Sequence, residues 1–181
     1  MHRASTAHTS EFTPAGLERI RALLDLAFEG DFTADDWDHT LCGIHATVHG
    51  DGGELLAHGS LVQRRLLHGG RALRTGYVEA VAVHPGHRRQ GLASAVMEAL
   101  ERVLHSGGYH IGALGAAAAA VPLYTGRGWQ QWRGRTAVLS PDGVVRTPEE
   151  DGHIYVLPMR MRSALALNGE LVCDWRPGDV W

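Results

Sequence analysis

A short basic turn in the middle of this sequence is well suited to binding a charged ligand. The β-branched run at residues 78–83 ends at His84-Pro85-Gly86, and the chain then passes through a basic turn into apolar residues at helical spacing. The first amides of a helix lack internal partners, and the helix dipole and two arginines add positive charge there. We therefore predict a pyrophosphate site whose turn residues are Arg88, Arg89, Gln90, Gly91, Leu92 and Ala93.

Two familiar phosphate-binding motifs are absent from the sequence. There is no G-x-x-x-x-G-K-S/T, and Gly86 and Gly91 do not give G-x-G-x-x-G. Neither a nucleotide triphosphatase nor a dinucleotide-dependent enzyme is therefore indicated. The turn by itself is also compatible with an ordinary strand-to-helix connection that carries surface arginines.

Hydrophobic spacing and cap signals predict the elements that hold this turn. One strand is expected before Thr13, followed by a helix from Pro14 to the stop at Gly30 and a short helix from the Thr33 cap to about Leu41. Three antiparallel strands are predicted at 43–49, 54–67 and 71–83, and later strands at 109–114, 129–139 and 153–157. Further helices are predicted at 91–105 and through the alanine-rich stretch to Tyr124, with a loop at 142–152 and a tail at 173–181.

Composition restricts the class of protein. The chain has 181 residues, 44% of them hydrophobic, so we expect a single domain over residues 1–181. Its net charge of −3, without clustered basic residues, argues against a nucleic-acid partner. No signal peptide or membrane segment is apparent, and two isolated cysteines, Cys42 and Cys173, favour a cytoplasmic setting. The twelve histidines lack metal-ligand spacing, so we expect no metal and mostly surface histidines.

Two ordered motifs resemble the GNAT superfamily of acetyl-coenzyme A-dependent N-acetyltransferases. The basic turn matches the pattern Q/R-x-x-G-x-G/A, and residues 120–129 match A-x-x-L-Y-x-x-x-G-F/W. Pro122 departs from the second pattern and places the expected helix start near Ala119, because proline is tolerated only in a first helical turn. The resemblance implies an α+β fold in which a mixed, mostly antiparallel sheet splays at its central strand and is flanked by helices. It also implies acetyl-CoA as cosubstrate, bound by Val81, Ala82, Val83 and the six turn residues.

Two residues are candidates for the chemistry of acetyl transfer. Transfer from a thioester to an amine needs a neutral amine, a polarised carbonyl and a proton for the leaving thiolate. Glu79, on the strand that leads into the turn, is the candidate base, acting directly or through water. Tyr124 is the candidate acid, since a phenol has a pKa of about 10. The alternatives are a solvated carboxylate at the first position and a core-packing ring at the second.

Acidic stretches at residues 30–38 and 148–152, together with Asp179 and the Trp181 carboxyl end, indicate a cationic acceptor. Together with Tyr77-Val78-Glu79 and the Cys-Asp-Trp-Arg-x-Gly-Asp-Val-Trp ending, they resemble the aminoglycoside 2′-N-acetyltransferases over nearly the whole chain. That resemblance implies a homodimer, and an aminoglycoside or similar polycationic amino sugar as acceptor, contacted in part by a chain-terminal carboxylate. We expect the tail to fold back onto the acceptor site near Asp31 and Glu79 and not to fray. The implied acceptor-binding residues are Asp31, Asp36, Glu79, Asp151, Asp179 and Trp181.

Three functions are open at this point. The first is an aminoglycoside 2′-N-acetyltransferase, and the second is a GNAT enzyme whose acceptor is a cell-wall amino sugar or a polyamine. The third is a catalytically silent acyl-CoA-binding module, against which Glu79 and Tyr124 argue. The sequence does not separate the first two, because both have a cationic amine as acceptor.

Overall fold

The computed structural model describes residues 2–159 and 165–181, and the contacts within the chain group into two compact units. The strands β3 (Leu55–His68) and β4 (Arg71–Val83) run through both units. A single domain over residues 1–181 stays a prediction. The first unit contains Met1–Val62 and Val78–Val103, and the second contains Gln63–Tyr77 and Leu104–Trp181.

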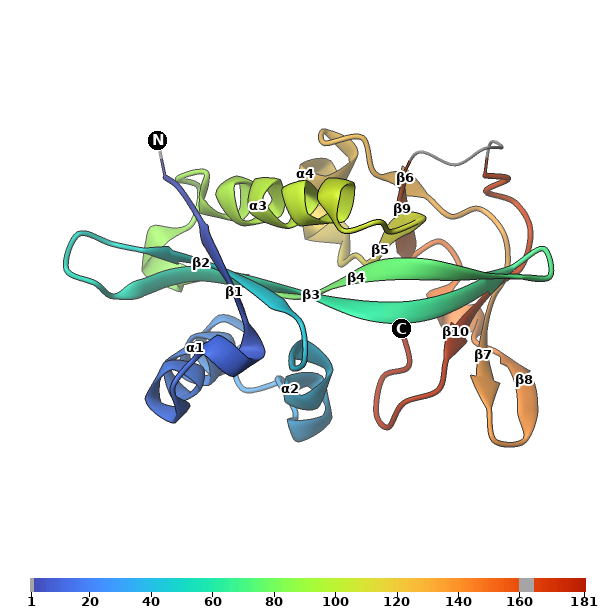
Figure 1. Cartoon of the computed structure of the whole chain (residues 1–181), viewed down its shortest axis with the longest axis horizontal. Helices are drawn as coiled ribbons and strands as arrows, with labels where there is room; N and C mark the ends of the chain where they lie inside the picture. Colours follow the sequence, from blue (N-terminus) through green and yellow to red (C-terminus); the bar gives the residue numbers. More distant parts are fainter. Residues whose placement is uncertain (1, 160–164) are drawn as a thin grey trace. The chain divides into compact units, whose positions relative to one another are not determined.

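The first unit is built on antiparallel strands with helices on both faces (Figure 1). β1 (Ser5–His8) pairs with β2 (Ile44–His49), and β2 pairs with the first part of β3. One face carries α1 (Pro14–Ala27) and α2 (Ala34–Thr40). The opposite face carries α3 (Leu92–Ser106), most of which belongs to this unit.

Each face of these strands has its own core. On the α1 side, Ile20, Phe32 and Ala82 belong to one buried cluster. On the α3 side, a Cβ added to Gly59 would lie 2.7 Å from the Val96 side chain, so the helix packs directly on the β3 backbone. The close approach requires glycine at that position.

The predicted helix caps are present. The Thr13 side chain accepts a hydrogen bond from the Gly16 amide, with Pro14 at the first helical position. Thr33 and Asp36 form a reciprocal capping box at the start of α2. Local side-chain hydrogen bonds of this kind satisfy amides that a helix start leaves unpaired. Both helix starts can therefore be predicted from the sequence.

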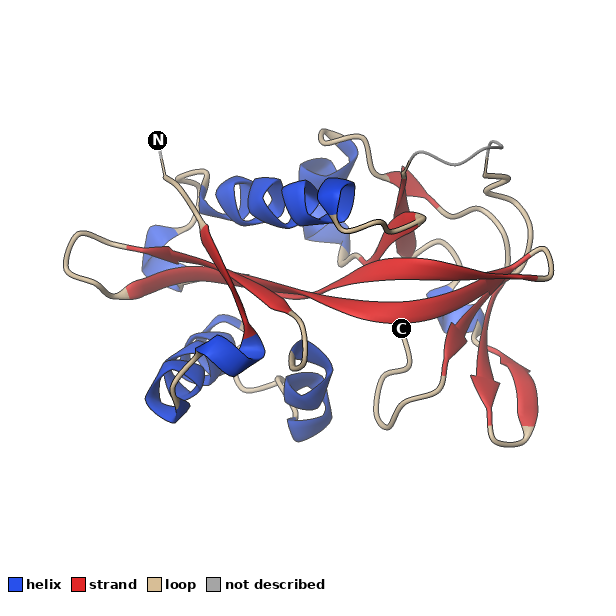
Figure 2. Cartoon of the chain, in the orientation of Figure 1, coloured by secondary structure: helices blue, strands red, loops and turns tan. Residues whose placement is uncertain are grey.

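The second unit is a mixed sheet (Figure 2). Its strands follow the order β6, β9, β5, β4, β3, β10, β7 and β8. The pairs β4–β5 and β10–β7 are parallel, and the pairs β6–β9, β9–β5, β3–β10 and β7–β8 are antiparallel. β5 pairs with β4 over Thr75–Tyr77. The strands are β5 (Ile111–Gly115), β6 (Gln130–Gln131), β7 (Thr136–Ser140), β8 (Gly143–Arg146), β9 (Ile154–Pro158) and β10 (Leu171–Asp174). The helical segments are 3-10 turns at Ala118–Ala120 and Pro148–Glu150 and α4 (Val121–Thr125).

Three parts of this unit differ from the sequence prediction. The predicted strand 129–139 is divided into β6 and β7, because the Arg133 and Gly134 amides both bond to the Leu167 carbonyl. A Cβ on Gly134 would lie 1.8 Å from the Gly169 carbonyl oxygen, so these two segments of the backbone are in direct contact. The predicted loop 142–152 contains β8, and β10 includes the first two residues of the predicted tail 173–181.

The architecture is α+β, as predicted, and the expected first-unit strands and 91–105 helix are confirmed within one or two residues. The alanine-rich stretch forms a 3-10 turn and then α4, whose first turn contains Pro122, close to the expected late start. No helix among residues 2–159 and 165–181 is long and apolar enough to cross a membrane.

Candidate active site

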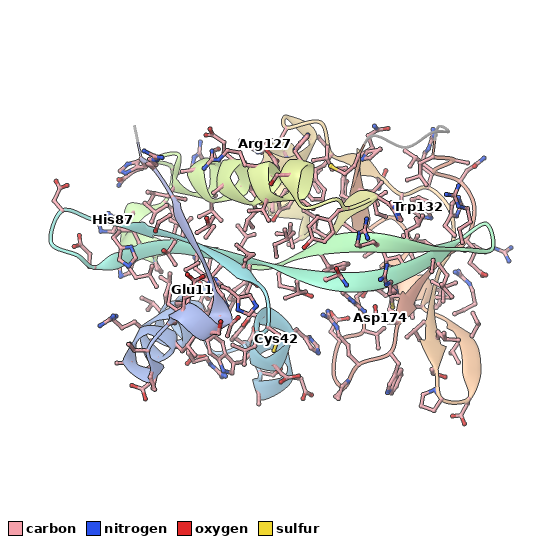
Figure 3. All side chains as sticks on the ribbon, viewed as in Figure 1. Glu11, Cys42, His87, Arg127, Trp132 and Asp174 are labelled. Carbon is pink, nitrogen blue, oxygen red and sulfur yellow. The ribbon has the colours of Figure 1, made fainter. Side chains whose placement is uncertain are left out.

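The basic turn after β4 lies in the first unit and has open space beside it, as the predicted pyrophosphate site requires. A 3-10 turn, Pro85–His87, follows the strand, and His87 is marked in Figure 3. Arg89 and Gly91 both have left-handed backbones, with φ of 65° and 80°. A Cβ added to Gly91 would meet no atom within 4 Å, so the space beside the turn is open. Alternating backbone handedness before a helix start turns successive amides to one side, which fits a pyrophosphate.

The other residues expected to contact coenzyme A contribute in different ways. Ala82 is 5% exposed and its side chain belongs to the α1 cluster, which makes its main chain the group available to a ligand. Arg88 donates a hydrogen bond to the Ala27 carbonyl at 3.3 Å, at the end of α1. Arg89 and Gln90 are exposed, whereas Leu92 is buried beneath the turn.

Glu79 lies beside a distortion of β4. The residue is half-buried, and the next residue, Ala80, has a φ of 49°. A left-handed residue inside a strand turns the local peptide groups out of the regular ladder. Such a residue redirects both the preceding side chain and the following amides, which belong to Val81 and Ala82.

The segment that carries Asp31 and Asp36 packs against this part of β4. Phe32 is buried in the same cluster as Ala82, and Trp37 and Ala80 pack around it. Asp31 is exposed, while one Asp36 carboxylate oxygen accepts hydrogen bonds from the Thr33 amide and hydroxyl, both at 2.8 Å. The structure therefore brings the predicted acidic segment beside the strand of the predicted base, with Asp36 also holding a helix start.

Tyr124 is the buried end of α4 in the second unit. Its side chain is 6% exposed and its ring makes an edge contact with Trp129, the centroids lying 6.3 Å apart. Burial raises the pKa of Tyr124 to about 12. The phenol therefore keeps its proton throughout the neutral range and can serve as a hydrogen-bond donor.

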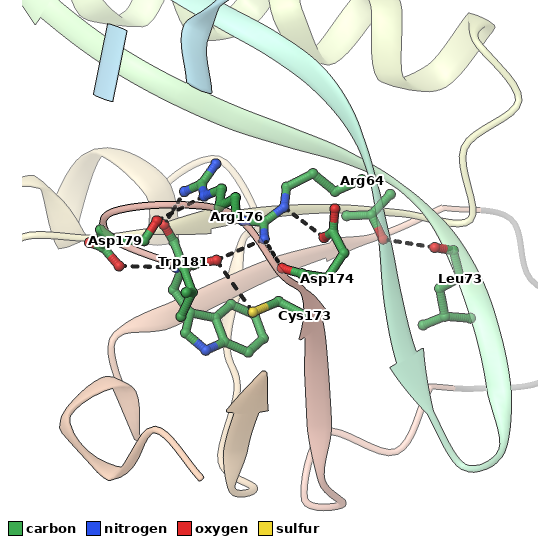
Figure 4. Close-up of polar contacts among 9 residues, drawn as sticks. Arg64, Leu73, Cys173, Asp174, Arg176, Asp179 and Trp181 are labelled. Carbon is green, nitrogen blue, oxygen red and sulfur yellow. Dashed lines mark hydrogen bonds and ion pairs between the residues drawn. The ribbon is translucent and has the colours of Figure 1, made fainter. Parts of the chain in front are cut away.

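Residues 173–181 fold back onto the second unit and do not fray. Trp181 is 4% exposed, and its indole N–H donates to the Thr147 hydroxyl at 2.9 Å. Its main-chain N–H donates to the Asp179 carboxylate at 3.0 Å. Arg176 donates to the main-chain oxygens of both Asp179 and Trp181, at 2.8 and 2.5 Å (Figure 4). Whether the segment reaches Asp31 and Glu79, which belong to the first unit, stays a prediction.

A buried arginine anchors the same segment from β3. Arg64, 4% exposed, donates to the carbonyls of Asp174 and Val180 at 2.9 and 2.7 Å and pairs with the Asp174 carboxylate (Figure 4). The guanidiniums of Arg64 and Arg176 lie 4.7 and 5.7 Å from the Tyr77 ring centroid. Charge-assisted bonds and cation–π contacts therefore hold the chain on either side of Asp179.

Asp151 is connected to Trp181 through two threonines. The Thr136 amide and hydroxyl donate to one Asp151 carboxylate oxygen, and Arg146 donates to the other at 2.7 Å. The Arg146 guanidinium and the Thr136 amide lower the pKa of Asp151 to about 2. The Thr136 hydroxyl also bonds to the carbonyl of Thr147, the partner of the Trp181 indole. The structure thus brings Asp151, Asp179 and Trp181 into one network, in which Arg146 partly compensates the Asp151 charge.

Several residues of this site were not identified from the sequence. Arg64 is adjacent to Arg65 in a strand, and pattern alone does not distinguish a buried arginine from an exposed one. Glu150 is half-buried, and burial and the Asp179 charge raise its pKa, which adds an acidic group to the network. Among residues 2–159 and 165–181, no three His, Cys, Asp or Glu side chains are placed to hold a metal ion.

Comparison with known proteins gives a consistent result. A family model for the acetyltransferase (GNAT) domain matches residues 8–132. An aminoglycoside 2′-N-acetyltransferase from Mycolicibacterium fortuitum is 49% identical over 183 aligned positions, which cover 100% of this chain and 93% of that protein.

Solved structures share the fold at low identity. A GNAT family N-acetyltransferase (YhbS) from Escherichia coli in complex with CoA has a TM-score of 0.66 at 20% identity, covering 96% of this chain and 91% of that one. A probable N-acyltransferase from Enterococcus faecalis V583 has a TM-score of 0.61 at 18% identity. That match covers 75% of this chain, which spans about a third, 34%, of the longer protein.

Proposed function

Because this chain belongs to the GNAT acetyltransferase family, we propose that it transfers the acetyl group of acetyl-CoA to the 2′-amino group of aminoglycoside antibiotics and so confers resistance. The observation that carries this proposal is the 49% identity, over the whole chain, to a protein named for that reaction. The acidic network around Asp179 supports a polycationic acceptor, since carboxylates bind ammonium groups through charge-assisted bonds.

Acetyl-CoA would be held by the chain's own backbone. Its thioester supplies an activated acetyl group, and the left-handed turn at Arg89 and Gly91 presents amides suited to its pyrophosphate. The main chain of residues 81–83 is the proposed partner of the pantetheine arm and the thioester carbonyl. The CoA complex of a fold relative supports acetyl-CoA as the cosubstrate.

In this proposal, Glu79 acts on the attacking amine and Tyr124 acts on the leaving sulfur. Glu79 accepts the proton of the acceptor ammonium, directly or through water, which frees the amine lone pair for attack. Tyr124 donates a hydrogen bond to the departing sulfur, which stabilises the thiolate as it leaves. The acceptor's other ammonium groups are assigned to Asp31, Asp36, Asp151, Asp179 and the main-chain end of Trp181.

Tyr124→Phe is expected to lower kcat by about tenfold and to leave the acceptor KM within about twofold. The effect is modest because burial raises the pKa of Tyr124 to about 12, above that of a thiol, so the phenol stabilises the leaving sulfur mainly by hydrogen bonding. Steady-state kinetics with both substrates varied would measure it. A native kcat in the variant would remove Tyr124 from the reaction.

The proposed activity is tested with a matched pair of aminoglycosides that differ only in having a 2′-amino or a 2′-hydroxyl group. Release of free thiol from acetyl-CoA is expected with the first and at most at background rate with the second. Equal release with both would place the acetylated nitrogen elsewhere. Preferential turnover of a simple polyamine or of an amino sugar of the cell wall would favour the alternative acceptor class.

The enzyme is further proposed to work in the cytoplasm as a homodimer. The family resemblance supports the dimer, and apolar side chains exposed on the β7–β8 hairpin give a surface suited to a second copy. Those side chains are Leu139, Val144 and Val145, exposed by 46%, 55% and 48%. Free Cys42 and Cys173 are compatible with a reducing compartment.

A further inference from the structure

Two fully buried histidines in the first unit form a hydrogen-bonded chain to the distorted residue of β4. His45 on β2 and His58 on β3 are both 0% exposed, exceptions to the expectation of surface histidines. His45 Nδ1 lies 2.9 Å from His58 Nε2, and His58 Nδ1 lies 3.1 Å from the Ala80 carbonyl oxygen. At the other end, the Thr9 hydroxyl lies 2.8 Å from His45 Nε2.

The carbonyl of Ala80, at one end of this hydrogen-bonded chain, determines which ring nitrogen of each histidine carries the proton. A carbonyl oxygen only accepts hydrogen bonds, so His58 must carry its proton on Nδ1. Its Nε2 then accepts from His45 Nδ1–H, and His45 Nε2 accepts from the Thr9 hydroxyl. Burial lowers the pKa of His45 to about 4 and that of His58 to about 3, so both rings are neutral at pH 7 and this order persists.

The hydrogen-bonded chain ends at Ala80, whose backbone conformation is unfavourable for an alanine. Ala80 has a φ of 49°, which L residues other than asparagine and aspartate rarely adopt. The Ala80 carbonyl has a donor from outside the ladder, and a backbone carbonyl without a donor is costly where it is shielded from water. His58 supplies that donor, and its ring is in turn oriented by His45.

We propose that the His45–His58 pair is a positioning device for acetyl transfer, holding the left-handed Ala80 so that Glu79 and the amides of residues 81–83 face the reacting groups. The proposal rests on the function proposed above. Packing alone does not explain two imidazoles at these positions, because burying a polar ring is unfavourable unless each of its nitrogens has a hydrogen-bond partner. Here all the ring nitrogens have partners, and the final partner is the residue beside the predicted base.

The decisive experiment combines loss of the donor with relief of the strain. His58→Phe keeps a ring but removes the N–H, and it is expected to lower kcat on the order of tenfold or more. Adding Ala80→Gly to that variant is expected to restore most of the lost kcat, because glycine adopts a positive φ without the donor's support. If His58→Phe does not fold, His45→Gln, which leaves the Ala80 donor in place but loosens its ring, is measured with and without Ala80→Gly.

A stability-matched control separates positioning from general destabilisation. Val48→Ala creates a small cavity at a buried β2 position outside the histidine chain, so it should lower Tm with kcat within about twofold of native. A histidine variant that keeps native kcat, or whose kcat loss Ala80→Gly does not relieve, would overturn the proposal.

The tautomers give a readout that needs no substrate. Two-bond proton–nitrogen NMR of the imidazoles at pH 7 is expected to show both histidines protonated on Nδ1. A proton on Nε2 of His58 would contradict this order of hydrogen bonds and would overturn the proposal. If the tautomers are as expected but no aminoglycoside is acetylated, the failure lies with the proposed acceptor, and the kinetic test is repeated with the acceptor that is turned over.

Discussion

Glu79→Gln is expected to lower kcat by about 10²-fold or more, with the acidic limb of the pH–rate profile altered. The substitution keeps the shape of a half-buried side chain on β4 but removes its capacity to accept a proton from the acceptor ammonium. The measurement is kcat and kcat/KM across pH with saturating acetyl-CoA. The effect should concentrate in kcat, since the interaction gains strength as the proton is transferred.

Glu54→Gln is the matched control for this variant. It makes the same chemical change in the same unit, at an exposed position in the turn between β2 and β3, and should leave kcat within about twofold. A Glu79→Gln enzyme that retains the native pH profile would show that another group deprotonates the amine.

Gly91→Val is expected to weaken coenzyme A binding on the order of 10²-fold. Two effects combine, because a β-branched residue is strained at a φ of 80° and its side chain would occupy the open space beside the turn. The loss of about two charge-assisted hydrogen bonds to the pyrophosphate would account for most of the change. Isothermal titration calorimetry with coenzyme A alone measures the affinity without involving an acceptor.

Gly53→Val separates the two effects. Gly53 has a φ of 84°, and a Cβ there also meets nothing within 4 Å, but it lies in the β2–β3 turn and is not one of the residues assigned to the pyrophosphate. Its valine variant should lose stability to backbone strain and keep native affinity for coenzyme A. If a folded Gly91→Val protein binds coenzyme A as tightly as the native chain, the turn is not the pyrophosphate site.

The parts of the fold that were predictable are those specified by local signals. The Thr13 and Thr33 caps fix two helix starts, and the glycines of the two hairpin turns delimit β2, β3 and β4. The basic turn was found in the same way, because an ending strand, a glycine and a helix start are all contiguous in sequence.

The parts that sequence reasoning missed depend on distant partners. β8 and β10 are strands of four residues, too short for a periodic pattern, and β10 exists through pairing with β7 and β3. The division at Gly134 depends on contact with Gly169. At the site, Ala80 carries no sequence signal for a positive φ, since alanine is not a residue that favours it.

The position of β10 inside its sheet has a consequence for how the protein is made. Residues 171–174 are inserted between β3 and β7, so the neighbours Leu67 and Val172 join segments separated by 105 residues of chain. Such a distant pairing closes a long loop and forms slowly compared with the hairpins and helices of the first unit. During synthesis the basic turn at residues 88–93 can fold while the second unit still lacks an interior strand. The network around Asp151, Asp179 and Trp181 is therefore assembled late, and a ribosome that stalls before residue 171 would release a chain with two unpaired strand edges prone to association.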